Sequence, residues 1–551
     1  MARGTAPVPG SLPARSLIRR GRLPRATLVL PFLLLVSACG PDEPLDIRGP
    51  TTAVGTAQYF ETTDGTRLAV DVYHPAEATG PFPTLLTLTR YRRGLEQASG
   101  RPIPTLSDLD RHFLSHGYAL VKVDARGSGA SFGSRPVEYG RQEVLDGYDV
   151  VQWVVSQDWS DGNVGAYGTS YTGTTAELLA AVDHPAVQAV IPGWSDFDAY
   201  VSPVRPYGLM ARGFIDTWSQ LVGAMDRNDR EALGAGVRKV DADRRGDLLA
   251  EAIEEHTANP DVARMVRETE FRDDTLAAGQ TWADIGPLNW KEAIERAATP
   301  MLVLVSWMDA GTADGALQRF RTFSNPQNVV VMASNHGGAS HASPYTVSDE
   351  PLPPLPGVHE QFELRRVFFD HHLKGANNGV SQWPAMRFFN LGEEAFHDTD
   401  RWPPAATTSR AFYLDDNGRL SPDSGEPPSE GAEAYPVDTG VTTGNQNRWM
   451  TQMGEAVLNL DDRGDMDARM LTYTSAPLTT DMQIAGHPVV SLRLASDRED
   501  GSLFVYLEDV DPEGRSRYLT EGGLRLLHRA AGTNPHFETE VPYRTFARSD
   551  A

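Results

Sequence analysis

The chain has 551 residues and a formal net charge of −24, with 40% hydrophobic and 23% charged residues. This length exceeds a single domain of roughly 150 residues, and the composition is that of a folded protein with a sizeable core. The acidic balance repels phosphate backbones, so we expect no nucleic-acid partner. The single cysteine, Cys39, excludes an internal disulfide and a zinc–cysteine cluster.

Residues 1–38 are expected to form a signal peptide. They hold six arginines and no acidic residue, and they end in an apolar stretch over 26–38 that is too short to span a bilayer. Residues 36–40, Val-Ser-Ala-Cys-Gly, resemble a bacterial lipobox, in which the cysteine is acylated and becomes the new N-terminus. We therefore predict a lipid anchor at Cys39, a tether over 39–55, and export to the cell envelope. The alternative is an ordinary signal peptide in which Cys39 has no role.

Strand-like and helix-like segments alternate between residues 56 and 200. This alternation predicts a parallel sheet covered by helices, the first part of an α/β core. Strands are expected at 66–75, 82–89, 118–124, 162–167 and 187–194, and helices at 106–115, 141–155 and 170–182.

The alternation stops over 201–298, where Ala, Arg, Asp and Glu dominate and β-branched runs are few. This composition predicts a helical insertion, most simply a cap over a site, and the alternative is a structural appendage. The core resumes over 299–404, with strands expected at 300–306 and 328–333 and helices at 314–323 and 360–374.

After residue 404, short strands separated by turns predict an all-β domain over 405–551, a sandwich or jelly roll. The strands are expected at 410–414, 471–473, 489–495, 503–510 and 523–528.

Three polar motifs follow predicted strands. They are Gly168-Thr-Ser-Tyr-Thr-Gly173, Trp307-Met-Asp309 and Asn335-His-Gly-Gly338. A nucleophile, an acid and a histidine in this order match the chain order of the α/β-hydrolase triad. The histidine accepts the serine proton, and the carboxylate fixes the histidine tautomer. We predict the triad Ser170, Asp309 and His336, with the Tyr171 N–H as one oxyanion donor and the loop 89–93 as the source of the other.

Other readings of these motifs exist. A literal G-x-S-x-G lies at 129–133, but no helix is expected after it, and the nucleophile elbow requires strand, serine and helix. The Ser170 run departs from the simple pattern, because its glycine comes at +3, and its alternative is a turn that caps a helix. Asp314 competes with Asp309, and His341 competes with His336.

We expect no metal and no cofactor. The chain has no H-E-x-x-H motif, no P-loop and no dinucleotide fingerprint, and the acidic cluster within 461–467 lacks the EF-hand spacing. The histidines other than His336 and His341 are expected to be surface or packing residues.

Together the motifs resemble the cocaine-esterase and X-Pro dipeptidyl-peptidase group of serine hydrolases, over about residues 66–529. The resemblance implies a hydrolase core, a helical cap and a C-terminal jelly roll. It also implies that the elbow glycine falls at +3 and that Tyr91 supplies the second oxyanion donor. The residues that carry it are 124–133, 168–173, 307–309, His336 before Gly337, 369–375, 402–404 and 509–514.

Two departures from this group stand out. Its members carry Gly-Pro-Trp-x-His where this chain has Ala333-Ser-Asn335-His336, so a packing neighbour of the histidine is replaced. Members also continue past the position of Ala551, so we expect a shortened jelly roll with unpaired edges, or one that another chain completes.

The expected activity is cleavage of an ester or amide acyl bond through an acyl-enzyme. The substrate would be a small-molecule ester, amide or short peptide, and a homo-oligomer is left open. Ala310, Gly311 and Thr312 stand where amino-ester relatives place acids, which argues against that class. Trp194 and Trp307 are expected to line an apolar acyl pocket, or else to be core residues. The alternatives are an X-Pro dipeptidyl-peptidase of the same fold and an inactive surface binding protein.

Overall fold

The computed structural model describes residues 53–551 apart from 76–77, 416, 423–431, 445, 453–459, 461, 534, 536, 538 and 540. The predicted signal peptide, Cys39 and all but the last three residues of the predicted tether lie outside the described residues. In the part of the chain that is described, no helix combines the length and the apolar character needed to cross a membrane.

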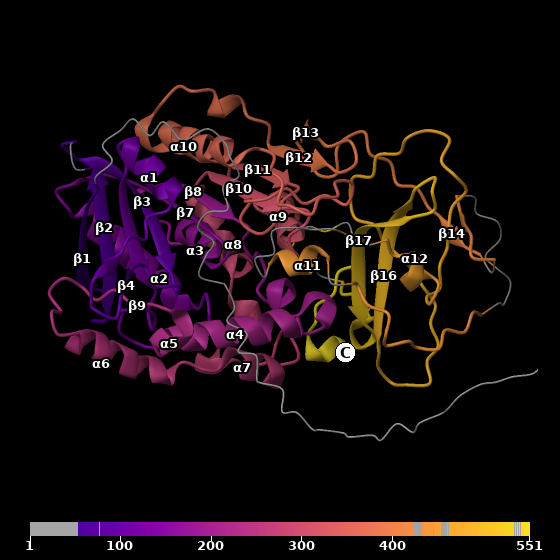
Figure 1. The fold of residues 1–551 in the computed structure, drawn as a ribbon, viewed down its shortest axis with the longest axis horizontal. Coiled ribbons are helices and arrows are strands. Elements are labelled where there is room, and N and C mark those ends of the chain that lie inside the picture. Colours follow the sequence, from indigo (N-terminus) through magenta and orange to yellow (C-terminus); the bar gives the residue numbers. More distant parts are fainter. Residues whose placement is uncertain are drawn as a thin grey trace, which may run out of the picture.

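A ten-stranded mixed sheet forms the centre of the molecule (Figure 1). Its order is β1-β2-β6-β3-β7-β8-β10-β11-β12-β13. The strands from β6 to β12 run parallel, β1 and β2 add an antiparallel edge, and β13 closes the other edge antiparallel to β12. The strands are β1 (Ala53–Glu61), β2 (Arg67–Pro75), β3 (Phe82–Thr89), β6 (Ala119–Asp124), β7 (Ser160–Thr169), β8 (Val187–Gly193), β10 (Met301–Ser306), β11 (Gln327–Met332), β12 (Met386–Asn390) and β13 (Ala395–Thr399).

Helices cover both faces of this sheet, because its parallel strands are apolar on both sides. In β10, Met301, Val303 and Val305 pack on one face, while Leu302 and Leu304 pack on the other. The first face is covered by α2 (Arg141–Val155), α3 (Tyr171–Ala180), α8 (Lys291–Ala297) and α9 (Thr312–Thr322), and the second by α1 (Asp108–Ser115) and α10 (Val358–Lys374).

The predicted α/β core is therefore confirmed, and most predicted core elements differ from the observed ones by at most a few residues. Strands β12 and β13 were missed because each has only five residues and carries polar side chains. The short strands β4 (Leu95–Glu96), β5 (Pro102–Ile103) and β9 (Gly236–Val237) form a small separate sheet that was also not predicted.

The segment 201–298 is largely helical and lies along the lower side of the core in Figure 1. Its apolar residues form a cluster around Ile215, Val222, Val266 and Trp282, which also includes Val137 and Tyr200 of the core. A cap role for this segment stays a prediction. Its helices are α4 (Arg212–Asp226), α5 (Arg230–Leu233), α6 (Asp247–Glu255), α7 (Val262–Glu268) and α8, which returns the chain to the core.

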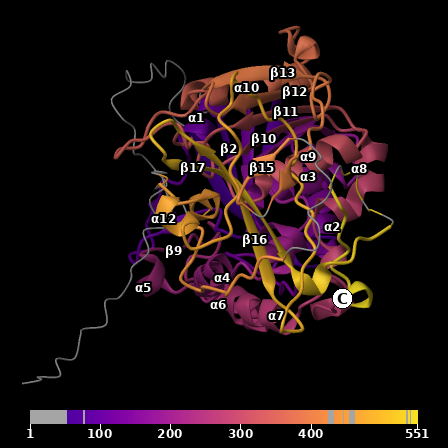
Figure 2. The same cartoon turned by 90° about the vertical axis from the view of Figure 1, so that its right-hand side faces the viewer.

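The C-terminal region lies beside the core, and Figure 2 shows its long hairpin in front. The described residues contain two two-stranded sheets, β14 (Tyr413–Leu414) with β15 (Leu420–Ser421) and β16 (Ser502–Val510) with β17 (Ser516–Arg525). They also contain the short helices α11 (Arg448–Thr451) and α12 (Gly464–Asp467).

The strands predicted at 471–473 and 489–495 are wrong. The sequence of 489–495 alternates as a strand should, but a strand needs a backbone neighbour. Among the described residues none pairs with it, and Val489 and Val490 are each 50% exposed. Closure of this region into a jelly roll stays a prediction.

Candidate active site

Ser170 occupies a strained turn of one residue between β7 and α3. Its backbone has φ 61° and ψ −128°, a left-handed conformation that is rare for a residue with a side chain. The Ser170 N–H donates to the Gly193 carbonyl at 2.9 Å, which ties the turn to β8. A strained serine between a strand and a helix is the geometry of a nucleophile elbow.

The neighbours of Ser170 explain the glycine at +3. A Cβ added to Gly173 would lie 2.4 Å from the Gly193 carbonyl oxygen, so only glycine lets α3 pack against β8 here. Thr172 at +2 is accommodated, because its Oγ1 accepts a hydrogen bond from the Thr169 N–H at 2.9 Å. The literal motif at 129–133 has no such setting, since Ser131 is fully buried and no helix follows it.

Asp309 and His336 meet at the ends of the adjacent parallel strands β10 and β11. His336 Nδ1 donates to Asp309 Oδ2 at 2.9 Å, and Asp309 is fully buried. Ser306 Oγ fixes the two loops to each other, since it donates to the Ser334 carbonyl at 2.7 Å and accepts from the Met308 N–H at 3.1 Å. Because the proton of the neutral His336 ring is on Nδ1, its Nε2 carries a free lone pair and can act as the base.

The electrostatics suit a histidine that gains a proton during a reaction. Burial alone would lower the pKa of His336, but the carboxylates of Asp309 and Asp196 outweigh burial and raise it. Asp309 in turn accepts a hydrogen bond from Thr312 Oγ1 at 3.1 Å, and Thr451 Oγ1 lies 3.4 Å from its Oδ1 while it donates to the neighbouring Met308 carbonyl at 2.7 Å. The acid is therefore held from its own loop and from the C-terminal region.

The His336 loop lies against the turn that carries Ser170. A Cβ added to Gly337 would lie 3.6 Å from Thr169 Cγ2, so the residues next to His336 and Ser170 are close neighbours. Within the described residues, Ser170 Oγ makes no hydrogen bond. The structure thus joins Asp309 to His336 directly and brings the Ser170 turn alongside them.

The Tyr91 side chain, predicted to supply the second oxyanion donor, lies against Tyr171, the first residue of α3. The Tyr171 N–H belongs to the first turn of this helix, where N–H groups have no acceptor within the helix. The Tyr91 and Tyr171 rings are in edge-to-face contact with centroids 5.8 Å apart. Trp218 Nε1 donates to Tyr91 Oη at 2.9 Å, so the Tyr91 hydroxyl proton is left for another acceptor. Burial raises the pKa of Tyr91 to about 12, so the phenol stays protonated at neutral pH.

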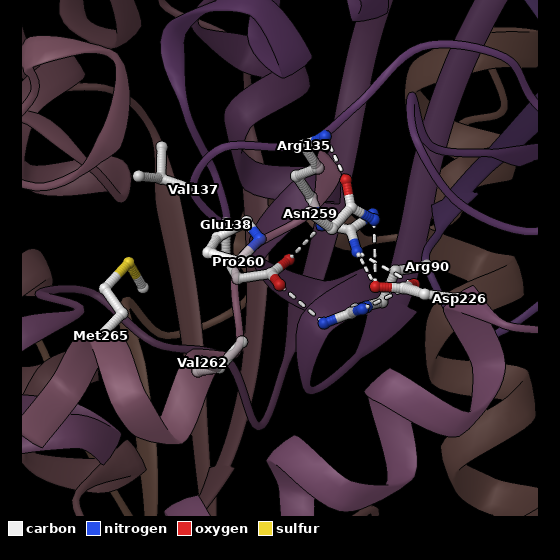
Figure 3. A pocket seen from close by; sticks show the side chains of 9 residues that line it. All are labelled: Arg90, Arg135, Val137, Glu138, Asp226, Asn259, Pro260, Val262 and Met265. Carbon is white, nitrogen blue, oxygen red and sulfur yellow. Dashed lines mark hydrogen bonds and ion pairs between the residues drawn. The ribbon is translucent and has the colours of Figure 1, made fainter. Parts of the chain in front are cut away.

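Buried ion pairs support the loop that carries Tyr91 (Figure 3). Arg90 pairs with Glu138 at 2.6 Å and with Asp226, the last residue of α4, at 3.0 Å. Arg135 pairs with the same two carboxylates at 2.9 and 3.3 Å. The Arg90 guanidinium also lies 5.0 Å from the centre of the Trp218 ring. The ion-pair network therefore holds both the loop that carries Tyr91 and the tryptophan that donates to its hydroxyl.

Three residues of this site were missed by the sequence analysis. Trp218 lies on α4 and Thr451 on α11, far along the chain from their partners, and no local motif marks either of them. Asp196 follows β8 and accepts a hydrogen bond from Ser202 Oγ at 3.2 Å. It interacts electrostatically with His336 and Asp309. Burial raises the pKa of Asp196 to about 7. Its place in Gly-Trp-Ser-Asp, directly after a predicted strand, was a usable signal.

The two predicted substrate-contact tryptophans pack against protein. Trp194 is 1% exposed, and a Cβ on Gly338 would lie 2.6 Å from its ring. Trp307 Nε1 donates to the Phe389 carbonyl at 2.7 Å, with its ring 5.6 Å from that of Trp402. These contacts favour the packing alternative, and a role in binding substrate stays a prediction for both.

Asn335 takes over the support of the His336 loop. Its side-chain oxygen accepts hydrogen bonds from the Ala339 N–H at 3.0 Å and the Ser340 N–H at 2.9 Å. In the Gly-Pro-Trp-x-His pattern the tryptophan position falls on Ser334, and Asn335 at the variable position closes the loop on itself. Of the two competitors, His341 pairs with Glu394 and Asp314 with His487.

The fold, the elbow and the acid–histidine pair define a serine hydrolase of the α/β-hydrolase fold. Residues 64–338 match the family model for X-Pro dipeptidyl-peptidase (S15 family). Residues 378–537 match the model for the X-Pro dipeptidyl-peptidase C-terminal non-catalytic domain. The chain belongs to this family, which includes serine esterases and X-Pro dipeptidyl-peptidases.

Known relatives span most of the chain. The "Putative serine esterase" of Mycobacterium bovis is 38% identical over 535 residues, covering 90% of this chain and 84% of the relative. The cocaine esterase of Rhodococcus is 26% identical over 506 residues, covering 86% and 83%. The crystal structure of an α-amino acid ester hydrolase superposes with a TM-score of 0.62 at 21% identity, covering 92% of this chain and 88% of that one. The predicted family and fold are therefore confirmed.

Proposed function

We propose that the protein cleaves an ester or amide acyl bond through a Ser170 acyl-enzyme, with His336 as the base and Asp309 as its partner. The observation that carries this proposal is the 2.9 Å hydrogen bond from His336 Nδ1 to buried Asp309, next to the strained Ser170 turn. A serine hydroxyl needs such a paired histidine to attack a carbonyl at neutral pH.

The chemistry follows from these groups. His336 Nε2 accepts the Ser170 proton as Oγ bonds to the acyl carbon, and the carbonyl electrons move to the oxygen. That oxyanion accepts hydrogen bonds from the Tyr171 N–H and the Tyr91 O–H. The intermediate then collapses, the bond between the acyl carbon and the leaving alcohol or amine breaks, and His336 gives that group its proton. Water then attacks the acyl carbon as His336 takes its proton, the bond to Ser170 Oγ breaks, and His336 returns the proton to Oγ as the acid product leaves.

An esterase acting on a small-molecule ester is the first candidate, supported by the 38% identity to the mycobacterial esterase and by the match to cocaine esterase. An X-Pro dipeptidyl-peptidase is the second, supported by the family model over residues 64–338 and by relatives of that name at 21–23% identity. A dipeptide substrate carries an ammonium group, which needs an anion to bind it. The Asp196 carboxyl could supply that anion, which favours the second candidate.

A fluorophosphonate probe tests the nucleophile, and a substrate panel separates the two candidates. We expect wild-type protein to be labelled and the S170A variant to remain unlabelled. Labelling that persists in S170A would place the nucleophile elsewhere, and no labelling of the wild type would favour the inactive binding protein. Faster turnover of p-nitrophenyl esters than of Xaa-Pro anilides would identify the esterase, and the reverse order the peptidase.

We also propose that the mature protein is held at the bacterial envelope by a lipid on Cys39. The support is the signal-like sequence of residues 1–38, with the only cysteine of the chain at the lipobox position. Mass spectrometry of the mature N-terminus should find an acylated Cys39, and the C39S variant should leave the membrane fraction. An unmodified cysteine in membrane-bound protein would exclude this anchor.

A further inference from the structure

A cluster of two histidines and a glutamate joins α1 to α10 on the face of the core opposite α3 (Figures 1 and 2). His112 lies in the last turn of α1, His116 is the residue that ends this helix, and Glu363 lies on α10. One ligand atom of each residue lies within 4.8 Å of the other two. We propose that these three side chains bind one zinc-type divalent metal ion that links the two helices.

The spacing of the ligand atoms is close to what zinc requires. Two ligand atoms of a tetrahedral zinc site, at bond lengths of about 2.0–2.1 Å, lie about 3.3 Å apart. His112 Nε2 and Glu363 Oε1 are already 2.9 Å apart. The His112 and His116 ring centroids are 4.4 Å apart, and the two residues are four positions apart at the end of α1. His116 is exposed, so its ring can rotate to complete the site without disturbing the core.

Neighbouring groups prepare each ligand. His116 Nδ1 lies 2.7 Å from the His112 carbonyl, which only accepts, so the His116 proton sits on Nδ1 and the Nε2 lone pair is free. Arg366 Nη2 donates to Glu363 Oε2 at 2.6 Å and Arg366 Nε lies 3.3 Å from Oε1, so the carboxylate is held with Oε1 at 2.9 Å from His112 Nε2. Such outer contacts fix the tautomer of a ligating histidine and the orientation of a ligating carboxylate in metal sites.

The charges around the three ligands act in opposite directions. The Glu363 carboxyl can supply the one negative charge of the site, and its Oε1 lies 2.9 Å from His112 Nε2, which has no hydrogen-bond partner among the described residues. The positive charge of Arg366 weakens the site, so we expect binding weaker than in a structural zinc finger.

Titration of metal-free, untagged full-length protein with ZnCl2 by calorimetry tests this proposal, with Co²⁺ absorption bands as a second readout. We expect one Zn²⁺ per chain, a higher thermal midpoint with Zn²⁺, and binding weakened about tenfold or more in H116A and E363Q. The matched control is H371A, because His371 also lies on α10 but bonds to the Ala376 carbonyl instead of a carboxylate. This control should bind as wild type does.

The H336A variant excludes zinc binding at the proposed catalytic histidine, and it should keep full stoichiometry. Three results would each overturn the proposal. They are a wild type without saturable zinc binding, H116A and E363Q variants that are folded by circular dichroism and bind within about twofold of wild type, or loss of the bound ion in H336A or H371A. Because E363Q keeps the shape of the side chain, it remains informative if H116A fails to fold.

Discussion

Removing the Tyr91 hydroxyl isolates one oxyanion donor. In Y91F the ring remains, so its edge-to-face contact with Tyr171 is kept. The lost O–H proton is the one left over after the oxygen accepts from Trp218 Nε1 at 2.9 Å. Loss of one such donor costs about 10²–10³ in kcat, or about 2.7–4 kcal/mol of transition-state stabilisation, and the Tyr171 N–H would carry the rest.

Steady-state hydrolysis of a p-nitrophenyl ester measures this effect. We expect kcat of Y91F to fall by this factor, with KM within about threefold of wild type, because the donor acts on the oxyanion and not on the bound ester. W218F is the matched control, since it removes the partner of the phenol but leaves its proton in place, and it should lose less than about tenfold. Activity of Y91F within about threefold of wild type, or equal losses in Y91F and W218F, would refute the assignment of Tyr91 as a donor.

Three further predictions concern the surroundings of the triad. Because Asp309 raises the pKa of His336, the acidic limb of kcat/KM should have its midpoint above about pH 6.5 in a pH–rate profile, and a midpoint at or below this pH would contradict the assignment of His336 as the base. R90A leaves Glu138 and Asp226 to share Arg135 alone and should destabilise the fold by about 1–3 kcal/mol, seen as a lower thermal midpoint, and an unchanged midpoint would contradict this. G173A should lose fluorophosphonate labelling, because its Cβ would lie 2.4 Å from a carbonyl oxygen of β8, and normal labelling would show that the elbow tolerates it.

The parts of this protein that sequence predicted well are those set by neighbouring residues. The order of strand, Ser170 and helix can be read within one short segment, and so can the positions of Asp309 and His336 just after the ends of β10 and β11. Because these two strands are adjacent and parallel, their ends bring the two side chains together. The predicted helix over 141–155 has the bounds of α2 for the same reason, since apolar periodicity and length are properties of one segment.

The parts that sequence missed depend on contacts between distant segments. Residues 489–495 alternate as a strand does, yet the pattern carries no information on whether a neighbouring strand is present, and in the described residues it has none. No sequence motif marks Trp218 or Thr451. Each contacts Tyr91 or Asp309 from a distant part of the chain, and one such contact imposes no recognisable spacing of residues. The His112–His116 pair was readable as a helical spacing, but its glutamate comes from another helix.

Thr451 shows how the C-terminal region, matched to a domain described as non-catalytic, contributes to the proposed triad. Its Oγ1 donates to the Met308 carbonyl at 2.7 Å and lies 3.4 Å from Asp309 Oδ1, while the Arg448 carbonyl accepts from the Ala310 N–H at 2.8 Å. One short helix thus holds both sides of the acid. The core alone would leave the Met308 carbonyl and the Ala310 N–H, on either side of the acid, without these partners.

The T451V variant tests this dependence, because valine keeps the shape of threonine but cannot donate. The hydrogen bond lost is the one to the Met308 carbonyl at 2.7 Å, next to the acid, and such a bond contributes about 0.5–1.5 kcal/mol, so we expect kcat/KM to fall about two- to tenfold. The matched control is T443V, since Thr443 lies in the same region and contacts Tyr506 instead of the acid. Equal activity of T451V and T443V would mean that Asp309 is held by its own loop alone, and that the C-terminal region only packs against the core.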